Sequence, residues 1–213
     1  RRFALRPHVK KVRGELESLT ESLGKWEPLI RLYRLHVDDV TESTPRQAIN
    51  LTVAQVLNER LGRSEEALSF YHAVLDDEAE HQESLDALEA IYQRLDRPEE
   101  LLDVYRRKVD LLEDSDAKLD YLYRISEIFA DRLEAPEDAI GALQEALGLQ
   151  PESLESYSRL DELYGATENW SELARNLEQI ITLVADDMES QIGFKHRLAQ
   201  VHETYLEDAH AAI

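Results

Sequence analysis

Apolar residues recur at intervals of three and four along almost the whole chain. An example is the series Leu119, Leu122, Tyr123, Ser126, Phe129, Ala130 and Leu133, in which only Ser126 is polar. This spacing places them on one face of an α-helix, whereas the alternation typical of a half-buried strand is not found. We therefore predict an all-α chain of about eleven helices with a twelfth truncated. The predicted helices lie near residues 8–22, 27–40, 45–61, 64–78, 80–95, 98–113, 116–132, 136–149, 152–165, 169–185 and 188–205.

A short motif of helix-ending and helix-starting residues recurs six times. It begins each time at one of the anchor residues Leu23, Leu61, Leu95, Leu133, Thr167 and Leu206. The anchors are separated by 38, 34, 38, 34 and 39 residues, so the larger repeat unit is a double one of 72 or 73 residues. A glycine or polar residue ends one helix, and Pro, or Ser or Thr with Glu, begins the next. The pattern predicts successive helix pairs, each with a first helix before the motif and a second helix after it.

Two segments carry the consensus of a known repeat. Residues 157–164 match W-x2-L-G-x2-Y, with Tyr157 for Trp and Asp161 for Gly, and residues 139–151 match A-x3-F-x2-A-x4-P, with Leu143 for Phe. In these segments, and more weakly over nearly the whole chain, the sequence resembles the tetratricopeptide repeat (TPR) family. The departures from the family pattern are the missing first-helix glycine and the alternation of 38- and 34-residue spacings.

The resemblance implies a right-handed α-solenoid of about six TPR-like helix pairs, the last truncated, with one concave face. We expect residues 1–213 to be a single solenoid segment excised from a longer protein. Residues 209–213 would begin the missing second helix of the last pair, and such an uncapped end could self-associate.

In TPR proteins the first helix of each pair lines the concave side. By motif register, the lining here would comprise Glu59, Glu83, Asp86, Gln93, Tyr121, Arg124, Asp131, Glu155, Ser158, Glu162, Phe194 and Arg197. We predict partner contacts by nine of these residues: Glu83, Asp86, Tyr121, Arg124, Asp131, Glu155, Glu162, Phe194 and Arg197. The Lys/Asn clamp of chaperone-binding TPR domains does not occur at the matching positions, so an acidic C-terminal peptide is not the expected ligand.

Charge narrows the class of partner. The chain holds 24 Lys and Arg against 45 Asp and Glu, a net charge of −21. This balance argues against nucleic-acid binding, which needs a basic surface. A partner of the acidic concave face should therefore carry a basic segment.

Catalytic and metal-binding patterns are largely absent from the sequence. There is no cysteine, no glycine-rich phosphate loop and no G-x-S-x-G motif. The segment 202–206 begins like H-E-x-x-H, but Leu206 stands where the second zinc ligand would be. Asp114, Ser115 and Asp116 resemble the start of a calcium loop, although a helix cap is the favoured interpretation. We predict no enzyme activity, no metal and no cofactor.

Trp26 and Trp170 share one position in the repeat, at the start of a second helix. Tryptophan is enriched at binding hot spots, but the shared position favours packing at a helix start. Thr44, Pro45 and Gln47 match a capping box, which predicts a helix start there.

Two hypotheses for function remain. We favour a non-catalytic scaffold that binds a protein or peptide partner, and the alternative is a structural spacer of a long repeat array with no ligand of its own. No apolar run approaches the roughly 18 residues of a membrane span, so no membrane insertion is expected. No signal peptide opens the segment. We expect a cytoplasmic location, with the periplasm as the alternative.

Overall fold

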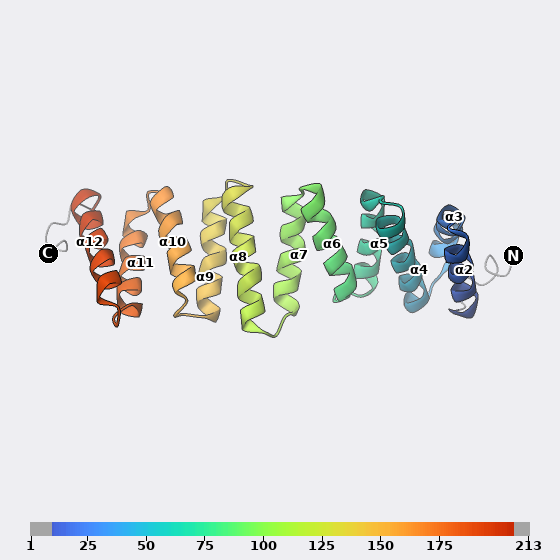
Figure 1. Cartoon of the computed structure of the whole chain (residues 1–213), viewed down its shortest axis with the longest axis horizontal. Helices are drawn as coiled ribbons and strands as arrows, with labels where there is room; N and C mark the ends of the chain where they lie inside the picture. The colour runs from blue at the N-terminus through green and yellow to red at the C-terminus, as the bar shows by residue number, and fades with distance from the viewer. Residues whose placement is uncertain (1–9, 207–213) are drawn as a thin grey trace. The chain divides into compact units, whose positions relative to one another are not determined.

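The computed structural model describes residues 10–206. Over these residues it is helical throughout, with no strand. The elements, labelled in Figure 1, are α2 (Lys10–Leu23), α3 (Trp26–His36), the 3-10 helix η1 (Val37–Asp39), α4 (Ser43–Gln55), the π-helix η2 (Val56–Arg60), α5 (Ser64–Asp77), α6 (Gln82–Leu95), α7 (Pro98–Leu111), α8 (Ser115–Asp131), α9 (Pro136–Leu149), α10 (Leu154–Ala166), α11 (Trp170–Leu183) and α12 (Met188–Thr204). The sequence prediction of an all-α fold is confirmed.

The helices follow the predicted pairing. The first helices are α2, α4 with η2, α6, α8, α10 and α12, and the second helices are α3, α5, α7, α9 and α11. The contacts group the chain into two compact units that divide between Val104 and Tyr105, within α7. In the second unit α8, α9, α10, α11 and α12 each pack against the next helix in sequence, and α4, α5 and α6 do so in the first unit. This consecutive packing is that of a TPR-like helical solenoid. Residues 209–213, expected to begin a further helix, lie outside the described residues.

The same turn ends five of the first helices. The residue after each anchor has a positive φ: 62° at Gly24, 66° at Gly62, 59° at Asp96, 52° at Glu134 and 55° at Glu168. A left-handed residue at this position reverses the chain and lets the next N–H groups bond to carbonyls of the last helical turn. The repeated motif in the sequence therefore forms the same turn each time.

Side-chain caps begin the first helices from α6 onward. The side chains of His81, Asp114, Ser153 and Asp187 accept hydrogen bonds from backbone N–H groups in the first turns of α6, α8, α10 and α12. The Asp114 cap confirms the interpretation preferred over a calcium loop. The capping box predicted at Thr44 is wrong, because α4 begins at Ser43 without a side-chain cap bond.

The alternating spacing arises in the first helices. The second helices α5, α9 and α11 all have 14 residues, whereas α8 has 17 and α10 has 13. The α4 helix, at 13 residues, continues into the five residues of η2. Four additional residues are about one helical turn, so a first helix lengthens while its apolar face keeps its direction.

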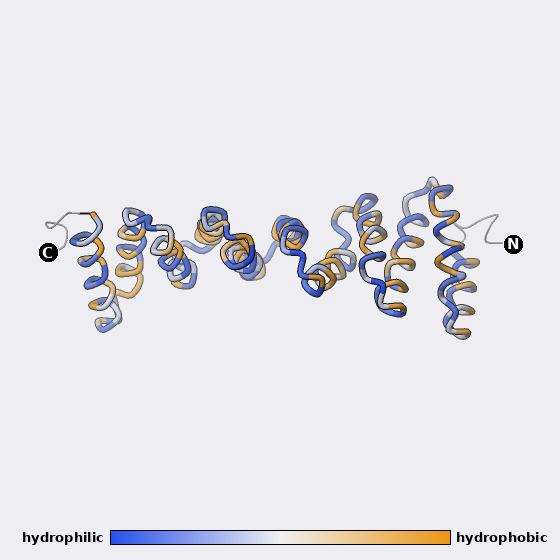
Figure 2. Tube along the Cα trace, turned by 90° about the horizontal axis from the view of Figure 1, so that it is seen from above, coloured by the Kyte–Doolittle hydropathy of each residue, from blue (hydrophilic) through white to orange (hydrophobic). Residues whose placement is uncertain are grey.

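Small and branched residues form the core between helices. Ala67 and Ala139 are fully buried at equivalent positions of α5 and α9, where a small side chain lets neighbouring helices approach. In the second unit, Leu143, Leu160, Tyr164, Leu177 and Val201 belong to one cluster that connects α9 to α12. Figure 2 shows hydrophobic segments of α11 and α12 facing each other.

Candidate protein-binding site

The first helices of the second unit are linked directly to one another. Arg159 of α10 forms an ion pair with Glu127 of α8 at 2.6 Å, and Arg197 of α12 forms one with Asp161 of α10. Neighbouring first helices of the unit are therefore joined by ion pairs, in the order α8, α10, α12. We call the exposed and half-buried side chains of these three helices the first-helix surface.

Seven of the nine predicted partner-contact residues lie on this surface. Tyr121, Arg124 and Asp131 are on α8, Glu155 and Glu162 on α10, and Phe194 and Arg197 on α12. The other two, Glu83 and Asp86, are exposed residues of α6 in the first unit. Glu83 there accepts a hydrogen bond from Gln55 of α4.

Tyr121 is surrounded by side chains of its own chain. Its hydroxyl accepts a hydrogen bond from the buried Lys108 ammonium at 3.2 Å. The Lys108 Nζ and the Arg124 guanidinium each lie 5.4 Å from the ring centroid, and the Tyr105 ring lies 5.2 Å away. Such cation–π contacts fix the ring in place. Tyr121 therefore stiffens the junction of α7 and α8 rather than standing out as a bare aromatic anchor.

Phe194 belongs to a different cluster. It is half-buried and packs against the core formed by α9, α10 and α11. Tyr121 and Phe194 therefore lie in two separate packing clusters.

A groove between α8 and α10 offers an alternative anchor site. It has a volume of about 470 Å³ and is lined by Leu119, Tyr123 and Leu154, with Asp116 and Glu155 among its acidic residues. Leu154 is 43% exposed. An apolar side chain with a basic neighbour would fit this combination of apolar wall and acidic rim. The groove could not be predicted from the sequence, because only the packing of two helix pairs creates it.

Each arginine of the first-helix surface is already neutralised within the chain. Arg124 pairs with Asp120 at 2.8 Å, and Arg159 pairs with Glu155 at 2.7 Å in addition to Glu127. Five carboxylates differ, because their side chains form no hydrogen bond or ion pair with any residue that the structure describes: Asp116, Asp131, Glu162, Glu189 and Glu203. The side chain of Lys118 in α8 also has no partner among the described residues, so the surface presents unpaired charge that is mainly negative.

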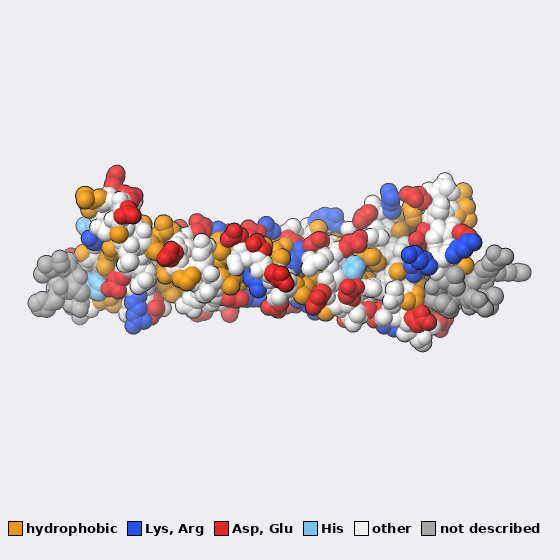
Figure 3. Space-filling view, turned by 90° about the horizontal axis from the view of Figure 1, so that it is seen from below, with side chains coloured by type: hydrophobic (Ala, Val, Ile, Leu, Met, Phe, Trp, Pro, Cys, Tyr) orange, Lys and Arg blue, Asp and Glu red, His pale blue; other side chains and the backbone are white. Residues whose placement is uncertain are grey.

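Negative charge is not confined to the first helices. The second helix α5 carries four carboxylates and no Lys or Arg, and α9 carries three and none. Figure 3 shows Asp and Glu side chains over both units, interspersed with Lys and Arg. Charge alone therefore does not single out the first-helix surface.

The two tryptophans occupy equivalent positions in the repeat but make different contacts. Trp170 packs on the core of the second unit and stacks on Tyr205, with ring centroids 3.7 Å apart. The centre of the Trp26 ring lies 5.7 Å from the guanidinium of Arg60. Arg60 directly precedes the anchor Leu61, as Tyr205 directly precedes the anchor Leu206. Trp170 is thus a packing residue, whereas Trp26 lines a cavity.

Within residues 10–206 no group of three or more His, Asp or Glu side chains is arranged to hold a metal ion. None of the described helices has the length and hydropathy needed to span a membrane.

Comparison with known proteins identifies the repeat. A family model described as tetratricopeptide repeat matches residues 84–118, which include α6 and α7. No curated protein sequence matches the chain.

Several solved structures resemble the fold. One is YrrB, described as a TPR protein with an unusual peptide-binding site, at 17% identity over 85% of this chain and 87% of that one, with a TM-score of 0.43. Another is MamA, at 14% identity over 84% and 93% of the two chains, with a TM-score of 0.44. A tetratricopeptide repeat protein from Parabacteroides merdae has 17% identity over 92% and 73%, with a TM-score of 0.42.

These structural scores are low, and the likeness to the tetratricopeptide repeat rests on the family model. Residues 84–118 match the tetratricopeptide repeat, and the helices on both sides of this segment form a TPR-like helical solenoid.

Proposed function

We propose that the chain is a non-catalytic scaffold that binds a protein or peptide through the first-helix surface of its second unit. The observation that carries the proposal is the groove between α8 and α10, where the apolar side chains of Leu119, Tyr123 and Leu154 lie beside acidic ones. Charge supports it: the arginines of α8, α10 and α12 are paired with carboxylates of the same three helices, while Asp131 and Glu162 have no partner among the described residues. A basic segment of a partner would supply the missing charges.

Charge would guide the partner and the groove would select it. Opposite potentials accelerate association, and their effect declines with salt because exposed charges are screened beyond about 8 Å at physiological ionic strength. The groove between α8 and α10 would take an apolar side chain next to Lys or Arg. Binding therefore requires both features, which gives more specificity than charge alone.

The test begins with a random peptide display library selected against the wild-type chain. We expect the selected peptides to carry Lys or Arg next to an apolar residue. The double variant Glu155→Lys/Glu162→Lys should bind such a peptide at least about tenfold more weakly, or about 1.4 kcal/mol. Circular dichroism should show an unchanged helical spectrum.

A matched control separates the first-helix surface from general acidity. Glu137→Lys/Glu178→Lys makes the same change in charge on the second helices α9 and α11, and Glu137, like Glu155, lies in a first helical turn. This control should retain the wild-type affinity. Equal losses in both variants would show that binding is unspecific attraction to an acidic protein. The absence of any selected peptide would favour a spacer without a ligand.

A further inference from the structure

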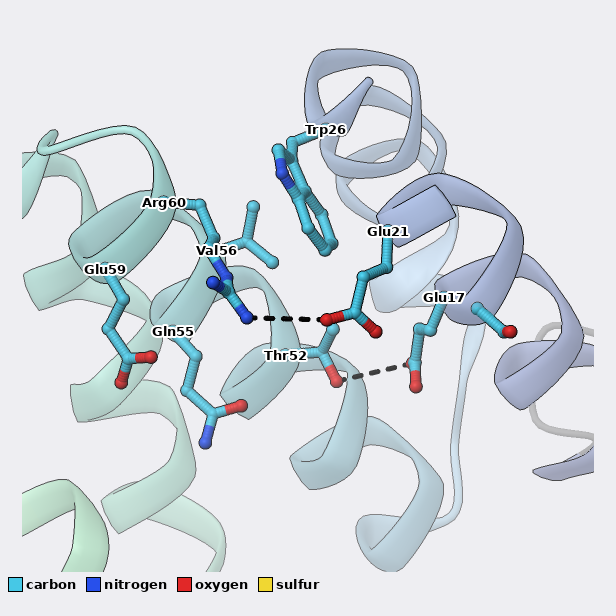
Figure 4. Close-up of a pocket in the computed structure, with 9 residues that line it drawn as sticks. Glu17, Glu21, Trp26, Thr52, Gln55, Val56, Glu59 and Arg60 are labelled. Carbon is cyan, nitrogen blue, oxygen red and sulfur yellow. Dashed lines mark hydrogen bonds and ion pairs between the residues drawn. The ribbon is translucent and has the colours of Figure 1, made fainter. Parts of the chain in front are cut away.

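A cavity in the first unit lies between two first helices, apart from the first-helix surface of the second unit. It has a volume of about 310 Å³ and lies between α2 and the end of α4 with η2 (Figure 4). Its lining is Glu17, Ser18, Glu21, Trp26, Thr52, Gln55, Val56, Glu59 and Arg60. Ligand pockets commonly begin at about 300 Å³. The cavity is therefore large enough for one side chain of a partner rather than for a large organic molecule.

The π-helical turn shapes one wall of this cavity. Val56, Glu59 and Arg60 all belong to η2, the one π-helical segment within the described residues. The Leu61 N–H bonds to the carbonyl of Val56, five residues earlier, at 3.1 Å. A π-turn is wider than an α-turn, and such turns are frequent at functional sites.

One carboxylate of the cavity is structural. Glu17 accepts a hydrogen bond from the buried Tyr33 hydroxyl at 2.8 Å and one from Thr52 at 3.4 Å. These bonds connect α2 to α3 and α4, so Glu17 forms a fixed back wall rather than a ligand group.

Trp26 and Glu21 of the cavity already contact a guanidinium, that of Arg60. Arg60 lies 5.7 Å from the centre of the Trp26 ring and pairs with Glu21 at 3.5 Å. Both side chains of this ion pair are more than half exposed, and exposed pairs contribute little stability. Figure 4 shows Arg60 and Glu21 pointing toward each other below the indole of Trp26. The arrangement is therefore one that an external guanidinium could reproduce by displacing Arg60.

Glu59 supplies a second negative group. It is exposed and has no hydrogen bond or ion pair with any described residue, and Figure 4 shows it on the same side of η2 as Gln55. A guanidinium is planar, so it can stack on an aromatic ring and donate two parallel hydrogen bonds to one carboxylate. An ammonium group has neither of these properties.

We propose that this cavity binds an arginine side chain of a peptide, with Trp26 as the stacking surface and Glu21 and Glu59 as the anionic groups. Arg60 occupies the Trp26 face in the absence of the peptide and leaves it on binding. The proposal does not depend on the first-helix surface of the second unit being a binding site.

The chain offers a clean readout, because it contains two tryptophans and the second, Trp170, lies in the other unit. The probe is the peptide acetyl-Gly-Arg-Gly-amide, titrated at constant ionic strength while the indole N–H signals are followed by NMR. The Trp26 signal should shift saturably and the Trp170 signal should stay in place. The same peptide with citrulline, which is neutral and of equal shape, should have no effect. A lysine peptide should bind more weakly.

Three variants test the assigned roles. Glu21→Gln/Glu59→Gln should weaken binding of the arginine peptide at least about tenfold. Arg60→Ala should strengthen it about threefold by removing the internal competitor. Glu15→Gln, an exposed position of α2 outside the cavity, should leave the affinity unchanged.

The proposal would be overturned by a Trp26 signal that ignores the arginine peptide in both the wild type and Arg60→Ala. Equal shifts of both tryptophans, or equal responses to arginine and citrulline, would also overturn it. Equal binding of lysine and arginine peptides would contradict the assignment of a guanidinium ligand. None of these results bears on the charge-reversal experiment in the second unit.

Discussion

The left-handed residues that end the first helices are not all suited to that conformation. Gly24 and Gly62 adopt it without strain, whereas Asp96, Glu134 and Glu168 carry side chains. For a residue with a Cβ, the left-handed conformation costs roughly 1–2 kcal/mol. The turns with Asp and Glu therefore reduce the stability of the chain.

Replacing one of these residues by glycine should stabilise the protein. We expect Glu134→Gly to raise the free energy of unfolding by about 0.5–1 kcal/mol, because glycine removes the strain at some cost in chain entropy. Gly62→Ala should lower it by about 1 kcal/mol. An added Cβ there would meet no atom within 4 Å, so backbone strain is its only cost. Urea denaturation measures both changes, and a lower midpoint for Glu134→Gly would contradict this account of the turn.

Asp161 is a buried carboxylate with one oxygen that lacks a hydrogen-bond partner. Its side chain is 8% exposed, and its Oδ1 has no hydrogen-bond partner in the structure. Burial raises the pKa of Asp161, Glu162 adds to the rise, and the ion pair and hydrogen bond with Arg197 act in the opposite direction. The net pKa lies above the ordinary value, so the folded state binds this proton more tightly than the unfolded state does.

The sign of this shift predicts a pH-dependent effect. The ionised group costs stability above its folded pKa, and the cost disappears as pH falls below the unfolded value of about 3.9. Asp161→Asn should therefore melt at a higher temperature than the wild type at neutral pH, and the two should converge below about pH 4. Thermal melts across this range test it. Asp120→Asn, which removes an exposed pair with Arg124, should change little at any pH. A neutral-pH melting temperature for Asp161→Asn below that of the wild type would mean that the Arg197 pair outweighs burial.

At the scale of the element, the helix pairs explain which features the sequence could predict. The spans of α9 and α11 follow from local signals, namely three-and-four periodicity, Pro136 at a helix start and the repeated turn. The π-turn at Val56–Arg60 has no such local signal. The Arg197–Asp161 pair and the cavity beside Trp26 depend on side chains that meet across neighbouring pairs, so spacing within one repeat could not locate them.

The same limit explains the outcome for the predicted site. Motif register placed seven residues on first helices of the second unit, because register fixes which helix a residue belongs to. It could not show that Lys108 and Tyr105 surround Tyr121, or that Phe194 packs on the core. Those contacts come from neighbouring helices.

The α9 helix provides a test of helix orientation. Ala139 is fully buried, so Ala139→Leu should overpack the contact and cost about 1–3 kcal/mol. Gly141, two residues later, is exposed, and an added Cβ would meet no atom within 4 Å. Gly141→Ala should stabilise the protein by nearly 1 kcal/mol through helix propensity. Chemical denaturation that gives both variants the same sign of effect would show that the faces of α9 are misassigned.

At the scale of the whole molecule, each unit repeats one design. Ion pairs and hydrogen bonds link first helix to first helix, as with Arg159 and Glu127 in the second unit and Arg60 and Glu21 in the first. Buried apolar residues pack each helix against the next one in sequence. Stability therefore comes from stacking of neighbours, as expected of a repeat protein, while the first helices remain available for contact. This division of labour is what the scaffold proposal requires.

The most direct test of the scaffold proposal is to map where a selected basic peptide binds. The peptide is added to isotope-labelled chain, and shifts of the backbone amide signals are recorded residue by residue. The account predicts that the largest shifts gather on α8, α10 and α12, around Glu155 and Glu162, and decline as salt is raised. Shifts that gather instead on the second helices α9 and α11, or that spread evenly over both, would contradict it.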